Sequence, residues 1–306
     1  MIDLKAENKA IPRKYKGKTK KGKKEEKKTM DRQFNTPLEV INANMKAGEG
    51  KASLPLGKMI LLGIVAGAFI ALGGATSSTA VHAIENVGMA RAMAGMIFPV
   101  GLMMIVFVGG ELFTGNCLLV MDVIGKKITV KACLRNLLVV YLSNLIGALL
   151  IDTLIYFSGN LDYSGGLLGA YAIKVAVGKV AITLVKAVTS GILCNILVCI
   201  AILMAGAATD IDGKIWAIFF PILAFVTGGF EHCVANMFYI PVGMMAAKNP
   251  AYVAKAQEAY QITAEQLASL TPIQSLHNFI PVTIGNIIGG MLLVGIPCYL
   301  IYKKEK

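Results

Sequence analysis

VGGELFTGN at residues 108–116 and TGGFEHCVAN at residues 227–236 decide the fold class of this chain. Each string places a Gly-Gly pair and a glutamate inside a segment otherwise apolar enough to cross a lipid bilayer. A carboxylate at membrane depth is costly and marks a functional pathway. Glycine interrupts a helix, and the backbone groups left unpaired there are tolerated only where protein encloses them. Two such breaks at matching positions in two halves indicate a transport site, so the sequence predicts a membrane transporter or channel.

Long stretches without Asp, Glu, Lys or Arg define six candidate membrane-spanning segments. A spanning helix needs about 20 apolar residues, and 56% of this 306-residue chain is hydrophobic. The fifth segment is longer than one crossing needs, as expected if its helix is broken near Gly228 and Gly229. The predicted fold class is therefore an all-α integral membrane protein. Its six segments are residues 59–84, 92–110, 136–157, 187–209, 215–247 and 279–302, of which the third continues past Asp152 and the fifth is interrupted by Glu231.

The third and sixth segments repeat each other. Asn136 and Asn144 are eight residues apart, as are Asn278 and Asn286, and Leu-Ile-Gly or Ile-Ile-Gly follows the second Asn of each pair. A Gly-Gly break precedes each of these pairs. The chain is thus predicted to contain two repeats of three spans. Because each repeat has an odd number of spans, the two must be inverted relative to each other in the membrane.

Two further regions precede the six-helix transport domain, which is expected over residues 57–303. Residues 1–34 hold 13 Lys or Arg and 5 Asp or Glu, a composition that predicts a disordered cytoplasmic tail touching anionic lipid. Tyr15 is the one aromatic residue among the basic residues of the tail, which is too few to favour a nucleic-acid partner. Residues 35–56 begin with Thr36, Pro37 and Glu39, a capping-box signature that predicts a short amphipathic helix on the membrane surface.

The distribution of basic residues predicts the orientation, because cytoplasmic loops are enriched in Lys and Arg. Residues 126–135 contain four basic side chains, and Lys303, Lys304 and Lys306 end the chain. Both termini are therefore expected in the cytoplasm, with the protein in the cell membrane. The outer segments are longer and of mixed charge, and the second of them is expected to carry Asp162, Lys174 and Lys179.

GELFTGN at residues 110–116 and FEHCVANMFYIP at residues 230–241 resemble the two signature regions of the formate/nitrite transporter family. The similarity continues through residues 136–147 and 191–199 and covers roughly residues 36–303. This resemblance implies a six-helix, aquaporin-like protomer with broken second and fifth helices, assembled as a homopentamer with one pore per protomer. It also implies transport of a small monovalent anion, formate first and nitrite or hydrosulfide next, with no cofactor and no metal.

The resemblance also assigns pore residues. The polar ones on the substrate and proton pathway are His232, Thr114, Asn195 and Lys179. Two hydrophobic constrictions are implied, one formed by Phe98, Leu102 and Val198 and the other by Leu112 and Phe225.

The residue types suggest how such a pore would work. A bare anion loses a large hydration energy in an apolar slit, whereas its neutral acid does not. We expect Lys179 to attract the anion, which gains a proton near Thr114 and His232 and passes as the acid. Glu111 and Glu231 would repel an anion, so they are expected to accept hydrogen bonds from backbone N–H groups freed at the breaks.

Two other functions fit parts of the sequence less well. An aquaporin-like channel for small neutral solutes needs paired Asn-Pro-Ala strings, and Asn249-Pro250 is the one Asn-Pro here, in a polar loop. A membrane-embedded hydrolase could use Glu231, His232 and Cys233, but metal catalysis needs three converging ligands. Nothing in the residues ranks formate, nitrite and hydrosulfide.

Overall fold

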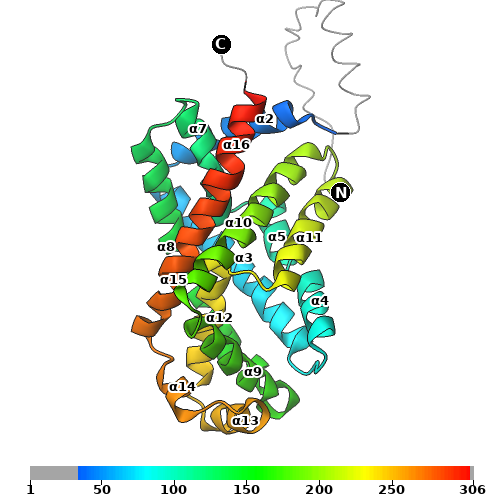
Figure 1. Ribbon diagram of the computed structural model, residues 1–306, viewed down its shortest axis with the longest axis vertical. Coiled ribbons are helices and arrows are strands. Elements are labelled where there is room, and N and C mark those ends of the chain that lie inside the picture. Colours follow the sequence, from blue (N-terminus) through cyan, green and yellow to red (C-terminus); the bar gives the residue numbers. More distant parts are fainter. Residues whose placement is uncertain (1–33, 304–306) are drawn as a thin grey trace, which may run out of the picture. The chain divides into compact units, whose positions relative to one another are not determined.

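The computed structural model describes residues 34–303, and six of its helical segments are long and apolar enough to cross a membrane (Figure 1). They correspond one to one to the six predicted spans. The predicted tail lies outside the described residues, apart from Phe34. In chain order the segments are α3 (Leu56–Val81), α4 with α5 (Val87–Ile97, Val100–Val108), α8 (Val130–Phe157), α10 (Leu184–Ala207), α11 (Ile211–Gly228), and α15, η3 and α16 together (Pro272–Ile287, Ile288–Gly295, Ile296–Tyr302).

The second and fifth spans are broken, as the two Gly-Gly strings predict. After α5, the chain turns at Gly109, whose φ is +105°, and continues as α6 (Phe113–Asn116), η1 (Cys117–Leu119) and α7 (Val120–Ile124). After α11, it turns at Gly229, whose φ is +70°, and continues as α12 (Cys233–Ala246). Glycine adopts these positive φ values without the steric penalty that a side chain would bring.

The two halves pack in the same way. Helix α3 packs along α8 in the first half, and α10 packs along α15 in the second. Both pairs touch through glycine: a Cβ at Gly147 would overlap the Ile64 carbonyl, and one at Gly289 would overlap the Ile192 carbonyl. Such close approach without side chains is typical of helix pairs in membranes. The matching contacts support the inverted repeat.

Additional helices cover the two opposite ends of the helix bundle (Figure 1). Helix α2 (Pro37–Ala52) lies at one end beside α7 and α16, and its Thr36–Glu39 capping box is present. Helices α9 (Tyr163–Val180), α13 (Pro250–Tyr260) and α14 (Ala264–Ala268) lie at the other end. We call these the α2 end and the α9 end.

Helix α9 was not expected, because residues 162–179 carry three charges within an apolar context and were assigned to a mixed outer loop. The structure instead has an 18-residue helix that packs against α12 and α13. Ser164, Gly165 and Gly166 have positive φ, so regular helical geometry begins after them. Lys179 is thereby fixed on the last turn of a packed helix.

Candidate functional site

His232 and Thr114 meet where the two helix breaks approach each other. The Nε2 atom of His232 lies 3.0 Å from Thr114 Oγ1, and both side chains are buried. His232 is the N-cap of α12, and its Nδ1 accepts the Ala235 N–H at 2.9 Å. Because Nδ1 acts as an acceptor, the neutral imidazole carries its proton on Nε2 and donates it to Thr114. The Thr114 hydroxyl proton then remains available for another acceptor.

Two aromatic rings cover His232. The Phe225 ring stacks on the imidazole with centroids 5.8 Å apart, and Phe98 meets Phe225 edge to face at 5.6 Å. Phe98 and Phe225 are expected in different constrictions, and in the structure their rings are in direct contact. They meet because α4 and α11 pack against each other at the ends that carry the two rings. Leu102, Leu112 and Val198, the other residues expected in the constrictions, are buried as well.

An open cavity of about 770 Å³ leads from the α9 end down to His232. His82 and Tyr260 lie at its rim, and Phe98, Phe225 and His232 line its deepest part. We call this cavity the vestibule. It gives a small solute an entry path that ends at the imidazole.

Asn195, on α10, supports this centre through backbone groups. Its side-chain amide donates to the Thr114 carbonyl at 3.2 Å and to the Asn286 carbonyl at 2.7 Å. Asn195 therefore links the first helix break, through Thr114, to the sixth span, through Asn286. Asn195 is expected on the substrate pathway, and in the structure it contacts the backbone of Thr114.

A polar cluster surrounds Glu231 at the α9 end. One carboxylate oxygen lies 2.7 Å from Lys179 Nζ, and the other accepts from Asn236 at 2.7 Å and from Asn278 at 3.3 Å. The Asn278 amide also donates to the Lys179 carbonyl at 3.0 Å. Lys179 thus faces the vestibule with its charge already paired.

An equivalent cluster surrounds Glu111 at the α2 end. Lys51 Nζ lies 3.3 Å from Glu111, the Asn116 amide donates to Glu111 at 2.6 Å, and the Asn136 amide donates to the Lys51 carbonyl at 3.2 Å. Lys51 is not among the site residues predicted from the sequence. A signal was available, because Lys51 precedes Gly63 by the same 12 residues that separate Lys179 from Gly191.

Two of the backbone N–H groups at the breaks donate to asparagines and not to the glutamates, from which this role was expected. Asn144 Oδ1 accepts the Phe113 N–H at 3.0 Å, and Asn286 Oδ1 accepts the Cys233 N–H at 2.9 Å. Each asparagine also donates to two backbone carbonyls, one of them that of the glutamate at the break. The asparagines thus provide hydrogen-bond partners within the protein for backbone groups that have no access to water at the depth of the bilayer.

The polar clusters around Glu111 and Glu231 are equivalent in the two halves, but the residues around His232 and Thr114 are not. The two breaks are offset by 120 residues, which makes Leu112 the equivalent of His232 and Val234 the equivalent of Thr114. The polar pair thus occurs once, at one depth of the bundle. The equivalent positions, Leu112 and Val234, carry apolar side chains.

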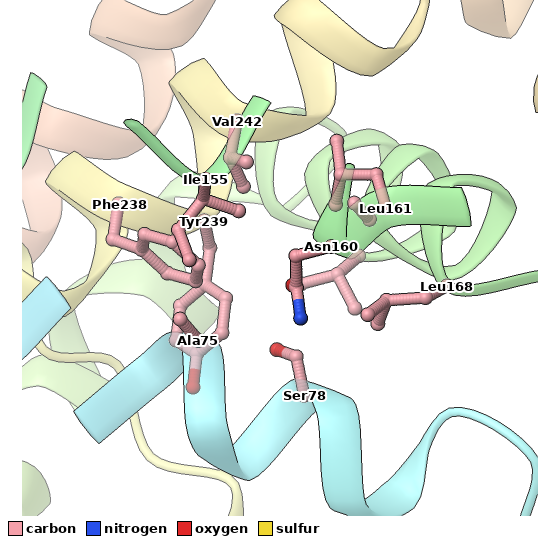
Figure 2. A pocket seen from close by; sticks show the side chains of 11 residues that line it. Ala75, Ser78, Ile155, Asn160, Leu161, Leu168, Phe238, Tyr239 and Val242 are labelled. Carbon is pink, nitrogen blue, oxygen red and sulfur yellow. The ribbon is translucent and has the colours of Figure 1, made fainter. Parts of the chain in front are cut away.

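A second, nearly closed cavity of about 10 Å³ lies between α3, α8, α9 and α12 (Figure 2). Ser78 and Asn160 point toward each other across it, and the remaining lining is mostly apolar. Such a volume holds about one water molecule. It is too small for a substrate and does not include His232.

The side chains of the three residues considered for a hydrolase form their hydrogen bonds with other groups. Glu231 contacts Lys179 and two asparagines, whereas His232 contacts Thr114 and the Ala235 N–H. Cys233 is fully buried. This geometry lacks the nucleophile–base hydrogen bond that such catalysis uses.

Comparison with known proteins identifies relatives over nearly the whole chain. Residues 38–300 match the protein family described as "Formate/nitrite transporter". A probable formate transporter of Methanothermobacter thermautotrophicus is 35% identical over 90% of this chain and 100% of its own length. The formate channel FocA of Escherichia coli (strain K12) is 36% identical over 88% of this chain and 95% of its own length.

Solved structures agree with this result. The structure described as "Pentameric formate channel with formate bound" superposes with a TM-score of 0.71 at 32% identity, covering 81% of this chain and 97% of that one. An FNT family ion channel superposes with a TM-score of 0.71 at 26% identity, covering 86% and 98%.

Proposed function

This chain belongs to the formate/nitrite transporter family, and we propose that it conducts formate across the cell membrane. The relatives named above are a probable formate transporter and a formate channel. The observation that carries the proposal is the His232–Thr114 hydrogen bond at the floor of an open vestibule. It supplies hydroxyl and N–H groups to a small anion at the point where an apolar passage begins.

The aromatic layer formed by Phe98 and Phe225 opposes the passage of a hydrated ion. A bare formate ion would lose most of its hydration between these rings, while formic acid would lose far less. We propose that formate takes a proton from water in the vestibule, is held by Thr114 and His232, and continues as the acid past Leu102, Leu112 and Val198. Net flux would then follow the formate gradient and the pH difference together.

His232 has a defined part in this scheme. Protonating Nδ1 would break the bond from the Ala235 N–H and uncap α12. The histidine therefore favours its neutral form and acts on the solute through the Nε2–H and Thr114. A relay through the imidazolium would have to release the helix cap in each cycle.

We further propose that the α2 end faces the cytoplasm and that five copies assemble. Residues 126–135, at the α2 end, carry four of the basic side chains that favour this orientation. The pentameric formate channel, 32% identical, supports five-fold assembly. Native mass spectrometry of the detergent-solubilised protein measures the copy number.

The function is tested by flux into proteoliposomes. Formate uptake should exceed that of empty liposomes and rise when the outside is made mildly acidic. Nitrite, hydrosulfide, water and glycerol in parallel assays rank the substrates. Rapid glycerol or water flux with no formate flux would favour the neutral-solute channel instead.

A further inference from the structure

The vestibule holds two cations that the pore mechanism does not use. Arg91 on α4 and Lys174 on α9 both line it. Among residues 34–303, neither forms an ion pair, whereas Lys179 is paired with Glu231. The unpaired positive charge of the vestibule therefore comes from Arg91 and Lys174, with Glu85 the one other carboxylate in the lining.

Arg91 is held against the second break. One of its guanidinium nitrogens, Nη1, donates to the Thr227 carbonyl at 3.4 Å, and the Thr227 hydroxyl donates to the Arg91 carbonyl. A Cβ at Gly229 would overlap the guanidinium. The guanidinium of Arg91 therefore occupies space that a side chain at position 229 would fill. Most of the N–H groups of this guanidinium remain open to the vestibule.

Lys174 is positioned by aromatic faces. Its Nζ lies 4.4 Å from the ring centroid of Tyr260 and 6.0 Å from that of Tyr171. The Tyr260 hydroxyl donates to the His82 carbonyl at 3.2 Å, which fixes that ring at the rim. Cation–π contacts orient an ammonium but leave its charge and its N–H donors available to an anion.

We propose that Arg91 and Lys174 form a docking site for carboxylates at the rim of the vestibule, ahead of the Lys179–Glu231 pair and His232. A guanidinium fork binds a carboxylate through two parallel hydrogen bonds, and a nearby ammonium adds charge. Both side chains are exposed, so the site binds formate weakly and raises its local concentration. A dicarboxylate can engage both cations and blocks entry.

The first test builds on the proposed function and measures formate uptake from the α9 side with fumarate as inhibitor. In Arg91→Gln/Lys174→Gln, KM for formate should rise about three- to tenfold at low ionic strength with kcat unchanged. Fumarate inhibition should weaken by about tenfold or more, and 0.5 M salt should erase both differences, since the screening length is then only about 4 Å. Lys255→Gln is the matched control, because Lys255 pairs with Glu258 on α13 and does not line the vestibule. Glu85→Gln should lower KM.

The second test does not need transport. Ala259 lines the vestibule and is exposed, so Ala259→Cys, in a background lacking Cys298, reports the local potential. Its reaction with an anionic methanethiosulfonate should be faster than with a cationic one, and the ratio should fall several-fold in the double variant. Fumarate should slow the anionic reaction in the parent only. An unchanged ratio, or equal fumarate inhibition in both proteins, overturns the docking site. A reporter response without any formate flux would refute the proposed substrate and leave the docking site standing.

Discussion

His232 Nε2 lies 3.0 Å from Thr114 Oγ1, and the two residues belong to opposite halves of the inverted repeat. His232 caps the helix after the second break, and Thr114 lies on the short helix after the first. Neither half can form this contact alone. Changes at either break should therefore reach the same point in the pore.

Replacing His232 with Asn should test whether the imidazole itself carries the proton. Asn is a strong N-cap residue, so its side-chain oxygen can accept the Ala235 N–H in place of Nδ1. The oligomer should keep its melting temperature, and formate uptake should still rise at mildly acidic pH, because formate takes its proton from water in the vestibule. Flux assays over a pH series, with the melting curve of each sample, measure both effects.

A control and a contrary outcome accompany this variant. His232→Leu removes the cap as well and should lower stability by about 1 kcal/mol. If His232→Asn loses the pH dependence of uptake at an unchanged melting temperature, His232 itself relays the proton, and its role as a neutral hydrogen-bond donor is wrong.

Asn144 and Asn286 should be the most sensitive polar residues of the fold. Asn286→Leu leaves the Cys233 N–H and the Gly191 and Glu231 carbonyls without partners. At about 1–3 kcal/mol for each buried group, the loss is large enough to prevent assembly. Asn144→Leu should cost the same, because its three bonds are equivalent. Leu276→Ala, which is 48% exposed on α15, is the control. Size-exclusion profiles and melting curves would contradict the prediction if both Asn variants behaved like the control.

The sequence was sufficient for the spans, the breaks and the repeat because each rests on a strong local signal. Uncharged runs near bilayer length identify the helices, and Gly-Gly-Glu and Gly-Gly-Phe-Glu interrupt them. The eight-residue spacing of Asn136 and Asn144, matched by Asn278 and Asn286, gives the repeat. All four asparagines prove to be buried partners of the breaks.

Long-range pairing was harder to predict. Lys51 lies 60 residues before Glu111, and its partner became visible only through the fold. Phe98 and Phe225 were separated into two constrictions because nothing in the sequence reports that α4 and α11 run side by side. Helix α9 was missed because Lys174 and Lys179 made an apolar helix resemble a loop.

The two lysine–glutamate pairs should respond differently to neutralisation. In the Lys179–Glu231 pair the side chains are 18% and 8% exposed, whereas Lys51 is 34% exposed against 6% for Glu111. Removing one partner of a buried pair costs about 3–5 kcal/mol, and an exposed pair contributes about 1 kcal/mol or less. Glu231→Gln should therefore lower the melting temperature more than Glu111→Gln. Lys179→Met added to Glu231→Gln should recover part of the loss. Equal melting temperatures for the two glutamine variants would show that burial does not control these pairs.

Leu102→Ala together with Leu112→Ala should let formate pass as the anion, without the coupled movement of a proton. Both side chains are buried at 3% exposure, and we assign them to the apolar part of the passage beyond His232. Smaller residues would let water accompany the anion, so the hydration penalty that favours the neutral acid falls. Anion current in planar bilayers should rise while its proton coupling weakens. Residues that face a passage should lose little stability, whereas packed leucines would cost about 2–5 kcal/mol each. Unchanged current with a collapsed melting temperature would show that these leucines are packing residues and that the passage runs elsewhere.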